Sequence, residues 1–167
     1  MAAEPNDQEF EAVLKLSTED RYRHFLKKIV DFDCVWMAED EEGLITIIGE
    51  GGQDVLPVWP ARRYAEQAMW KWPGAEFFQV TVQRWLEKTL LPIEDAADVA
   101  LAVFTDREGY GQLVQVPDMI TDLRAELGSR LGSLPGYDPE AEEIDLEALL
   151  KPAMKASMKA RPKGRLP

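Results

Sequence analysis

The chain has 167 residues, 46% of them hydrophobic, and its 31 acidic residues outnumber its 19 basic ones. This length and composition predict one domain with its own hydrophobic core. The acidic first ten residues, the single cysteine and the lack of a long apolar run argue against a signal peptide, an internal disulfide and a membrane-spanning helix. We therefore expect a cytoplasmic protein.

The charge is unevenly distributed along the sequence. Residues 151–167 hold six of the 19 basic residues and no acidic one, so residues 1–150 hold 13 basic residues against 31 acidic ones, a net charge of −18. An acidic body repels nucleic acid and favours basic protein partners, although the same charge also maintains solubility. We expect a basic protein partner, and neither nucleic-acid binding through the acidic body nor membrane binding.

Two helices are predicted at the start of the chain. The N-terminal segment, residues 1–17, has apolar residues from Phe10 to Leu16 at roughly helical spacing. Ser17 or Thr18 then caps a second helix with acidic residues in its first turn. The apolar face of that second helix consists of Tyr22, Phe25, Leu26, Ile29 and Val30.

Strand patterns follow. Residues 34–38, 44–48 and 55–59 are rich in apolar and β-branched residues and are separated by a polar turn and a glycine-rich turn, which predicts an antiparallel meander of three strands. Pro57 predicts that the third strand lies at a sheet edge or is irregular there.

Helices and strands alternate in the remainder of the core domain, which we place at residues 18–128. Pro60 starts a helix that runs to about Trp70, and residues 77–80 form a short strand. Thr81 caps a helix that ends at Leu91-Pro92. Residues 99–104 and 112–116 form a hairpin, and a last helix covers residues 117–127. The sequence therefore predicts a single α+β domain with an antiparallel or mixed sheet, flanked by helices.

Residues 129–167 predict an extension of different character. A linker rich in glycine and proline leads to a short acidic helix over residues 140–150, and the basic tail follows. The tail has lysines at every fourth position, which is compatible with a weak amphipathic helix. A disordered, solubilising tail is the interpretation that we favour.

No catalytic set of residues is visible, so we expect neither an enzyme nor a bound cofactor. His24 is the only histidine and Cys34 the only cysteine, so a structural metal site is not expected. Cys34 lies in an apolar strand, where cysteines are usually inert. The glycines at residues 49–52 lack the lysine and the following helix of a phosphate-binding loop.

The candidate binding residues are acidic and aromatic. Trp36 and Trp85 are expected in the core, whereas Trp70 and Trp72 flank Lys71 beside a Pro-Gly break and are expected to be partly exposed. The candidate partner-binding set consists of Glu39, Asp40, Glu41, Glu42, Trp59, Tyr64, Trp70 and Trp72.

The pattern Trp36, Gly43, Leu56-Pro57-Val58-Trp59-Pro60 and Tyr64-Ala65 resembles the bacterial family catalogued as domain of unknown function 2750. The similarity covers roughly residues 18–128. Members of that family often have an aromatic residue after the turn glycine, where this chain has Leu44. The resemblance implies a compact α+β domain of bacterial, cytosolic type and implies no reaction.

These observations favour a non-catalytic interaction protein. One version is an immunity or antitoxin-like protein whose acidic surface masks a basic partner such as a nuclease toxin. The alternative is a small-molecule or peptide binding module with an aromatic pocket near Trp59 and Tyr64. A carboxylate-only enzyme would require a buried cluster of acidic residues in a cleft.

Overall fold

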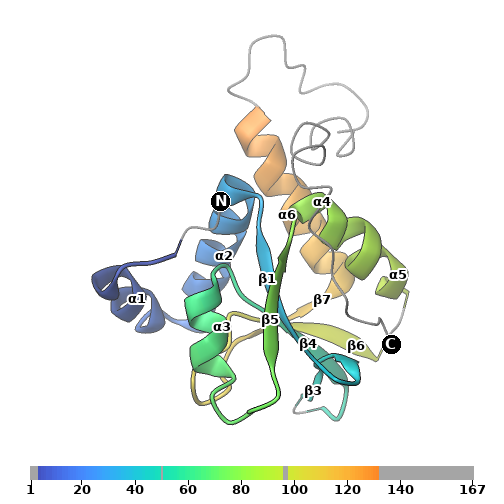
Figure 1. Ribbon diagram of the computed structural model, residues 1–167. Coiled ribbons are helices and arrows are strands. Elements are labelled where there is room, and N and C mark those ends of the chain that lie inside the picture. The colour runs from blue at the N-terminus through green and yellow to red at the C-terminus, as the bar shows by residue number, and fades with distance from the viewer. Residues whose placement is uncertain (1–3, 50, 96–97, 132–167) are drawn as a thin grey trace.

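A computed structural model describes residues 4–49, 51–95 and 98–131 (Figure 1). The extension predicted over residues 129–167 begins later than expected, because the last helix continues to Leu131 instead of ending at about residue 127. The remainder of the predicted linker, the acidic helix and the basic tail lie outside the described residues. The helices are α1 (Asp7–Leu14), α2 (Thr18–Phe32), α3 (Arg62–Ala68), α4 (Val82–Trp85), α5 (Leu91–Ile93) and α6 (Val116–Leu131), and a π-helical turn, η1 (Leu86–Leu90), joins α4 to α5. The strands are β1 (Val35–Asp40), β2 (Gly43–Leu44), β3 (Ile47–Ile48), β4 (Asp54–Val58), β5 (Glu76–Val80), β6 (Val99–Val103) and β7 (Gln112–Gln115).

The strands form two sheets, one in the order β2-β1-β5 and the other in the order β3-β4-β6-β7. The α+β class and the hairpin of β6 and β7 are as predicted. The predicted meander differs, because its middle strand is divided between the sheets: β2 pairs with β1, and β3 pairs with β4. Ile45 lies at the division, where its side chain is buried and its N–H donates to the carbonyl of Ala38 at 3.0 Å. Burial of Ile45 thus coincides with the crossing between sheets.

Strand β4 lies inside its sheet and not at an edge, because it pairs in parallel with β6 and antiparallel with β3. Pro57 is nevertheless tolerated for a local reason. The carbonyl of Val58 accepts a hydrogen bond from the N–H of Phe104, so the backbone polar groups of Val58 point towards β6. The backbone groups of the neighbouring Pro57 therefore point to the opposite side of the strand. On that side β3 pairs only with Asp54 and Val55, which leaves position 57 without a ladder partner.

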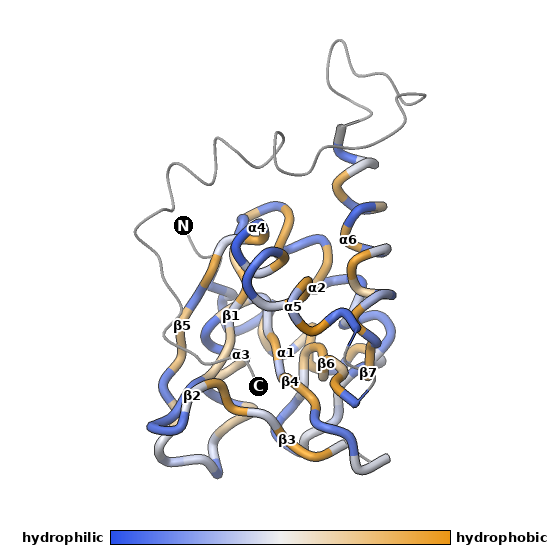
Figure 2. Tube along the Cα trace, turned by 90° about the vertical axis from the view of Figure 1, so that its right-hand side faces the viewer, coloured by the Kyte–Doolittle hydropathy of each residue, from blue (hydrophilic) through white to orange (hydrophobic). Residues whose placement is uncertain are grey.

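The core lies between the sheets and the helices that cover them. Helices α2 and α6 pack against each other and against β7, and α3 packs against β1 and β5. The largest fully buried side chains include Trp59, Trp85, Phe25 and Phe104. Trp36 and Trp85 are buried, as predicted. Figure 2 shows hydrophobic residues concentrated in the interior, with a further hydrophobic stretch along β3 at the edge of the molecule.

Two of the predicted helix starts are confirmed by their capping hydrogen bonds. The Ser17 hydroxyl accepts from the N–H of Asp20 at 3.1 Å, and the Thr81 hydroxyl accepts from the N–H of Arg84 at 3.2 Å. The second of these helices continues through the π-helical turn η1 and ends with α5 at Ile93, one residue after the predicted end at Leu91-Pro92.

The N-terminal segment packs onto α3. The carboxylate of Glu4 accepts hydrogen bonds from the N–H groups of Arg62 and Arg63 at 3.1 and 3.0 Å, and it therefore caps a helix whose own N-cap, Ala61, makes no side-chain bond. The Phe10 ring stacks on Tyr64, with the ring centroids 5.1 Å apart. These contacts join α1 to the core domain.

Candidate partner-binding surface

The acidic residues Asp40 to Glu42 lie at the turn between β1 and β2. Asp40 pairs with Gly43 across the ladder, which leaves Glu41 and Glu42 as the two turn residues. The Asp40 carboxylate accepts from the N–H of Glu42 at 2.9 Å, and Gly43 has a φ of 119°, a conformation that glycine adopts readily. The turn therefore holds the side chains of Glu41 and Glu42 at an exposed position.

This turn borders a surface cleft of about 650 Å³, here named the acidic cleft. Its opposite wall is the loop between α3 and β5, where the N–H of Ala75 donates to the carbonyl of Trp72 at 3.1 Å. The indole of Trp72 is 39% exposed, as expected from the sequence. The cleft is lined by Asp40, Glu41, Glu42, Trp72, Pro73, Gly74, Ala75 and Glu76.

The strands behind the cleft add a pair of like charges. Glu39 on β1 lies directly opposite Glu76 on β5 in the antiparallel register. Like charges in such a pair destabilise a sheet by a few tenths of a kcal/mol to about 1 kcal/mol.

Two of the predicted site residues lie elsewhere, in the core. Trp59 and Tyr64 are 0% and 2% exposed. The Trp59 indole N–H donates to the carbonyl of Thr105 at 3.2 Å, and Tyr64 makes an edge contact with Phe104 at 4.5 Å between centroids. Neither residue lines the acidic cleft or the two cavities described next. The structure therefore gives no support to an aromatic ligand pocket at Trp59.

Trp70 lines a second, smaller cavity of about 240 Å³, here named the Trp70 pocket. Its indole is 50% exposed, and its N–H donates to the carbonyl of Arg107 at 3.2 Å. The guanidinium of Arg107 and the ammonium of Lys71 lie 4.4 and 5.0 Å from the indole centroid, within cation–π range. The pocket is lined by Ile47, Pro57, Ala68, Met69, Trp70, Lys71, Trp72, Thr105, Arg107, Glu108 and Gly109.

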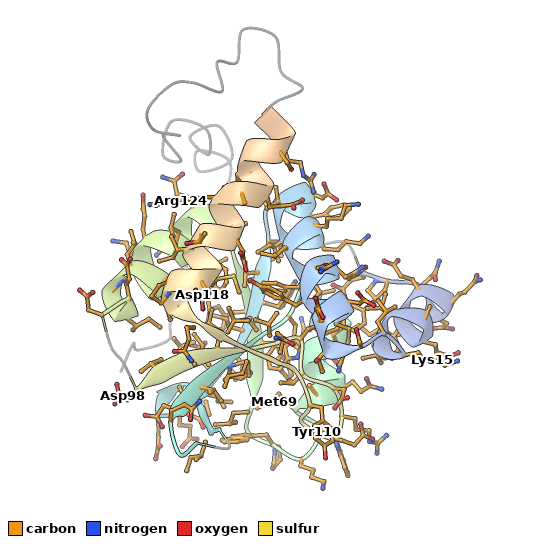
Figure 3. The ribbon with its side chains drawn as sticks, turned by 180° about the vertical axis from the view of Figure 1, so that it is seen from behind. Lys15, Met69, Asp98, Tyr110, Asp118 and Arg124 are labelled. Carbon is orange, nitrogen blue, oxygen red and sulfur yellow. The ribbon has the colours of Figure 1, made fainter. Side chains whose placement is uncertain are left out.

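A third cavity, of about 250 Å³, adjoins the Trp70 pocket through their shared residues Ile47 and Gly109. Ile48, Tyr110 and Leu113 line it and are 78%, 66% and 47% exposed. Figure 3 shows Tyr110 and Met69 at the same end of the molecule. The acidic cleft shares Trp72 with the Trp70 pocket, which in turn shares Ile47 and Gly109 with this apolar cavity, so the three are neighbours. The sequence indicates this region only in part, because Arg107 and Tyr110 come from a distant loop.

Cys34 and His24 are the single cysteine and the single histidine, and burial shifts the pKa of both. Cys34 is buried, its thiol donates to the side-chain oxygen of Gln79 at 2.8 Å, and burial raises its pKa to about 12. Burial also lowers the pKa of His24, and the positive charge of Lys28 adds to this effect. Within the described ranges, no group of three or more His, Cys, Asp or Glu residues is arranged to hold a metal ion. None of the described helices is long and apolar enough to cross a membrane.

The fold and this surface define a small α+β domain with an acidic, tryptophan-bearing cleft. A family model described as a protein of unknown function, DUF2750, matches residues 22–123, and the chain belongs to this family. The match covers both sheets, and it confirms the resemblance drawn from the Leu56 to Pro60 segment. No curated protein matches the sequence.

Proposed function

We propose that this chain is a non-catalytic protein-interaction domain whose acidic cleft binds a basic protein partner. The observation that carries the proposal is the grouping of four carboxylates, from Asp40, Glu41, Glu42 and Glu76, around the half-exposed indole of Trp72. Tryptophan is enriched among interface residues that contribute most to binding, and arginine and lysine side chains stack on its ring.

The charge of the body supports the same proposal. A net charge of −18 over residues 1–150 attracts a basic partner over a distance of about 10 Å at moderate ionic strength. Such steering raises the association rate more than it raises the affinity, and it decreases as salt is added. A basic enzyme, such as a nuclease toxin in the bacterial cytoplasm, has the charge that this cleft accepts. Masking of such an enzyme is the immunity-like version of the proposal.

Affinity capture with matched variants tests this function. Immobilised wild-type protein is compared with the cleft variant Glu41→Lys/Glu42→Lys and with the control Glu11→Lys/Glu94→Lys. Both variants change the net charge equally, but Glu11 and Glu94 are exposed residues of α1 and of the end of α5. We expect wild type and control to capture the same basic protein from host lysate and to release it as the salt concentration rises. We expect the cleft variant not to capture this protein. Equal capture by all three, or by none, contradicts the proposal.

A further inference from the structure

The Trp70 pocket combines an apolar floor with a cationic rim. Apolar lining comes from Ile47, Pro57, Ala68 and Met69. Lys71 and Arg107 supply two positive charges and Glu108 supplies one negative charge, so the rim carries a net positive charge. Among the described residues, neither cation lies within ion-pair distance of a carboxylate, whereas Arg62 and Arg63 each have an acidic partner. In a body of net charge −18, two neighbouring cations without such partners are open to an external anion.

Hydrogen bonds and an ion pair hold the loop that carries Arg107 in place. The Asp106 carboxylate accepts from the N–H groups of Glu108 and Tyr110, both at 3.0 Å. The buried Arg21 donates to the carbonyl of Phe104 at 3.0 Å and lies 3.5 Å from the Asp106 carboxylate. The backbone of Arg107 is therefore fixed before any ligand binds, which lowers the entropy cost of binding.

We infer that the Trp70 pocket binds the C-terminal residue of a protein partner, with its apolar side chain on the pocket floor and its terminal carboxylate between Lys71 and Arg107. A C-terminal residue carries an apolar group and an anion within one residue, which matches a cavity of about 240 Å³ that is lined by apolar residues and by two cations against one carboxylate. The carboxylate would accept charge-assisted hydrogen bonds from the Arg107 guanidinium.

This inference rests on the proposed function and specifies the partner further. Trp72 lines both the Trp70 pocket and the acidic cleft, so a chain that ends in the pocket reaches the cleft with the residues just before its end. The partner is therefore a basic protein whose C-terminal segment carries lysine or arginine and ends in a large apolar residue.

The test uses N-acetyl-leucine as a probe of the terminal residue, and N-acetyl-leucinamide as its uncharged match. The indole N–H signal of Trp70 in the full chain, assigned with Trp70→Phe, is followed by NMR during each titration. We expect acetyl-leucine to shift this signal saturably, with a dissociation constant on the order of 1 mM. We expect the amide to bind about tenfold more weakly.

Two variants link the effect to the rim. Arg107→Gln and, independently, Lys71→Gln are expected to weaken acetyl-leucine binding about tenfold and fivefold, and Arg124→Gln is expected to leave it unchanged. Arg124 is an exposed residue of α6, at a distance from the pocket in Figure 3. Retained dispersion of the NMR spectrum shows that each variant is folded.

The inference is overturned by equal binding of acid and amide, by no shift of the Trp70 signal, or by unchanged binding in both rim variants. A basic probe peptide such as pentalysine separates this failure from failure of the proposed function. If pentalysine shifts the indole N–H signal of Trp72 while acetyl-leucine has no effect on that of Trp70, the acidic cleft is supported as a binding site and the inference about the Trp70 pocket is overturned. If acetyl-leucine shifts the Trp70 signal while pentalysine has no effect on that of Trp72, the Trp70 pocket is supported and the proposed binding of a basic partner in the acidic cleft is overturned.

Discussion

Trp36 and Trp59 exchange two backbone hydrogen bonds, of 2.9 and 3.0 Å, and so join the two sheets at one antiparallel bridge. Trp36 belongs to the strand that leads into the acidic turn, and Trp59 follows the strand that contributes Pro57 to the Trp70 pocket. The bridge therefore links the strand that leads into the acidic turn to the strand that contributes Pro57 to the Trp70 pocket.

Removal of the Trp59 indole N–H is expected to destabilise the fold. Trp59→Phe leaves the buried carbonyl of Thr105 without its donor and creates a cavity, so we expect a loss of about 2 to 3 kcal/mol in the free energy of unfolding. Urea unfolding followed by circular dichroism measures this loss. Trp72→Phe, at a half-exposed position, is the control and is expected to cost less than about 0.5 kcal/mol. Similar values for both variants would contradict the core role of Trp59.

Glu4 is expected to stabilise the chain through the start of α3. Glu4→Ala removes the acceptor for the N–H groups of Arg62 and Arg63, and with it a favourable negative charge at a helix N-terminus. We expect a loss of about 1 kcal/mol. Glu11→Ala on α1 changes the charge equally at an exposed position and is expected to have little effect. Equal stability of Glu4→Ala and wild type in urea unfolding would show that the cap contributes nothing.

Glycine is expected to be required at position 111 and dispensable at position 74. A Cβ at Gly111 would lie 2.7 Å from the carbonyl oxygen of Val103 and 2.9 Å from the Thr105 side chain, whereas a Cβ at Gly74 meets no atom within 4 Å. Because the closest atom at position 111 belongs to the backbone, Gly111→Ala is expected to lower the thermal midpoint by several degrees. Gly74→Ala is expected to leave it nearly unchanged. A Gly111→Ala protein as stable as wild type would show that this loop adapts easily.

The stability of the protein is expected to decrease in alkali partly through Cys34. Burial raises the pKa of the folded thiol from 9.0 to about 12, so the unfolded chain loses its proton first as the pH rises. The stabilisation of the folded state by the protonated Cys34 thiol is complete below pH 9. It is lost between about pH 9 and pH 12, at up to about 1.4 kcal/mol per pH unit. The pKa values of Tyr22 and Tyr64 are also raised by burial and act in the same direction at higher pH.

Cys34→Ala isolates the thiol contribution. Between pH 8 and pH 10 the free energy of unfolding of the wild type is expected to fall by about 1.4 kcal/mol more than that of the variant. Identical pH dependence of the two proteins would mean that the thiol titrates normally in the folded state. Alkylation of the thiol with iodoacetamide at pH 8, expected only after unfolding, provides an independent measurement.

Sequence reasoning located the elements that depend on local signals. The apolar periodicity of Tyr22 to Val30 and the Ser17 cap identified α2, and the polar residues 106–111 identified the turn between β6 and β7. The partial exposure of Trp70 and Trp72 followed from the Pro-Gly break beside them. Each of these features is determined by residues close together in the chain.

The features that sequence reasoning missed depend on contacts between distant residues. The parallel pairing of β4 with β6 joins segments more than 40 residues apart, and the Glu4 carboxylate caps a helix 58 residues later in the chain. Arg107 reaches Trp70 from another loop. The sequence does not show that Trp59 and Tyr64 are core residues, because aromatic residues occur in both cores and interfaces and composition alone does not separate the two.

Titration of the full chain with pentalysine, followed through the indole N–H signal of Trp72, tests the central claim most directly. We expect a saturable shift that weakens as salt rises, is lost in Glu41→Lys/Glu42→Lys and is retained in Glu11→Lys/Glu94→Lys. A shift of equal size in both double variants, or no shift of Trp72 at low salt, would contradict the acidic cleft as the binding site for a basic partner.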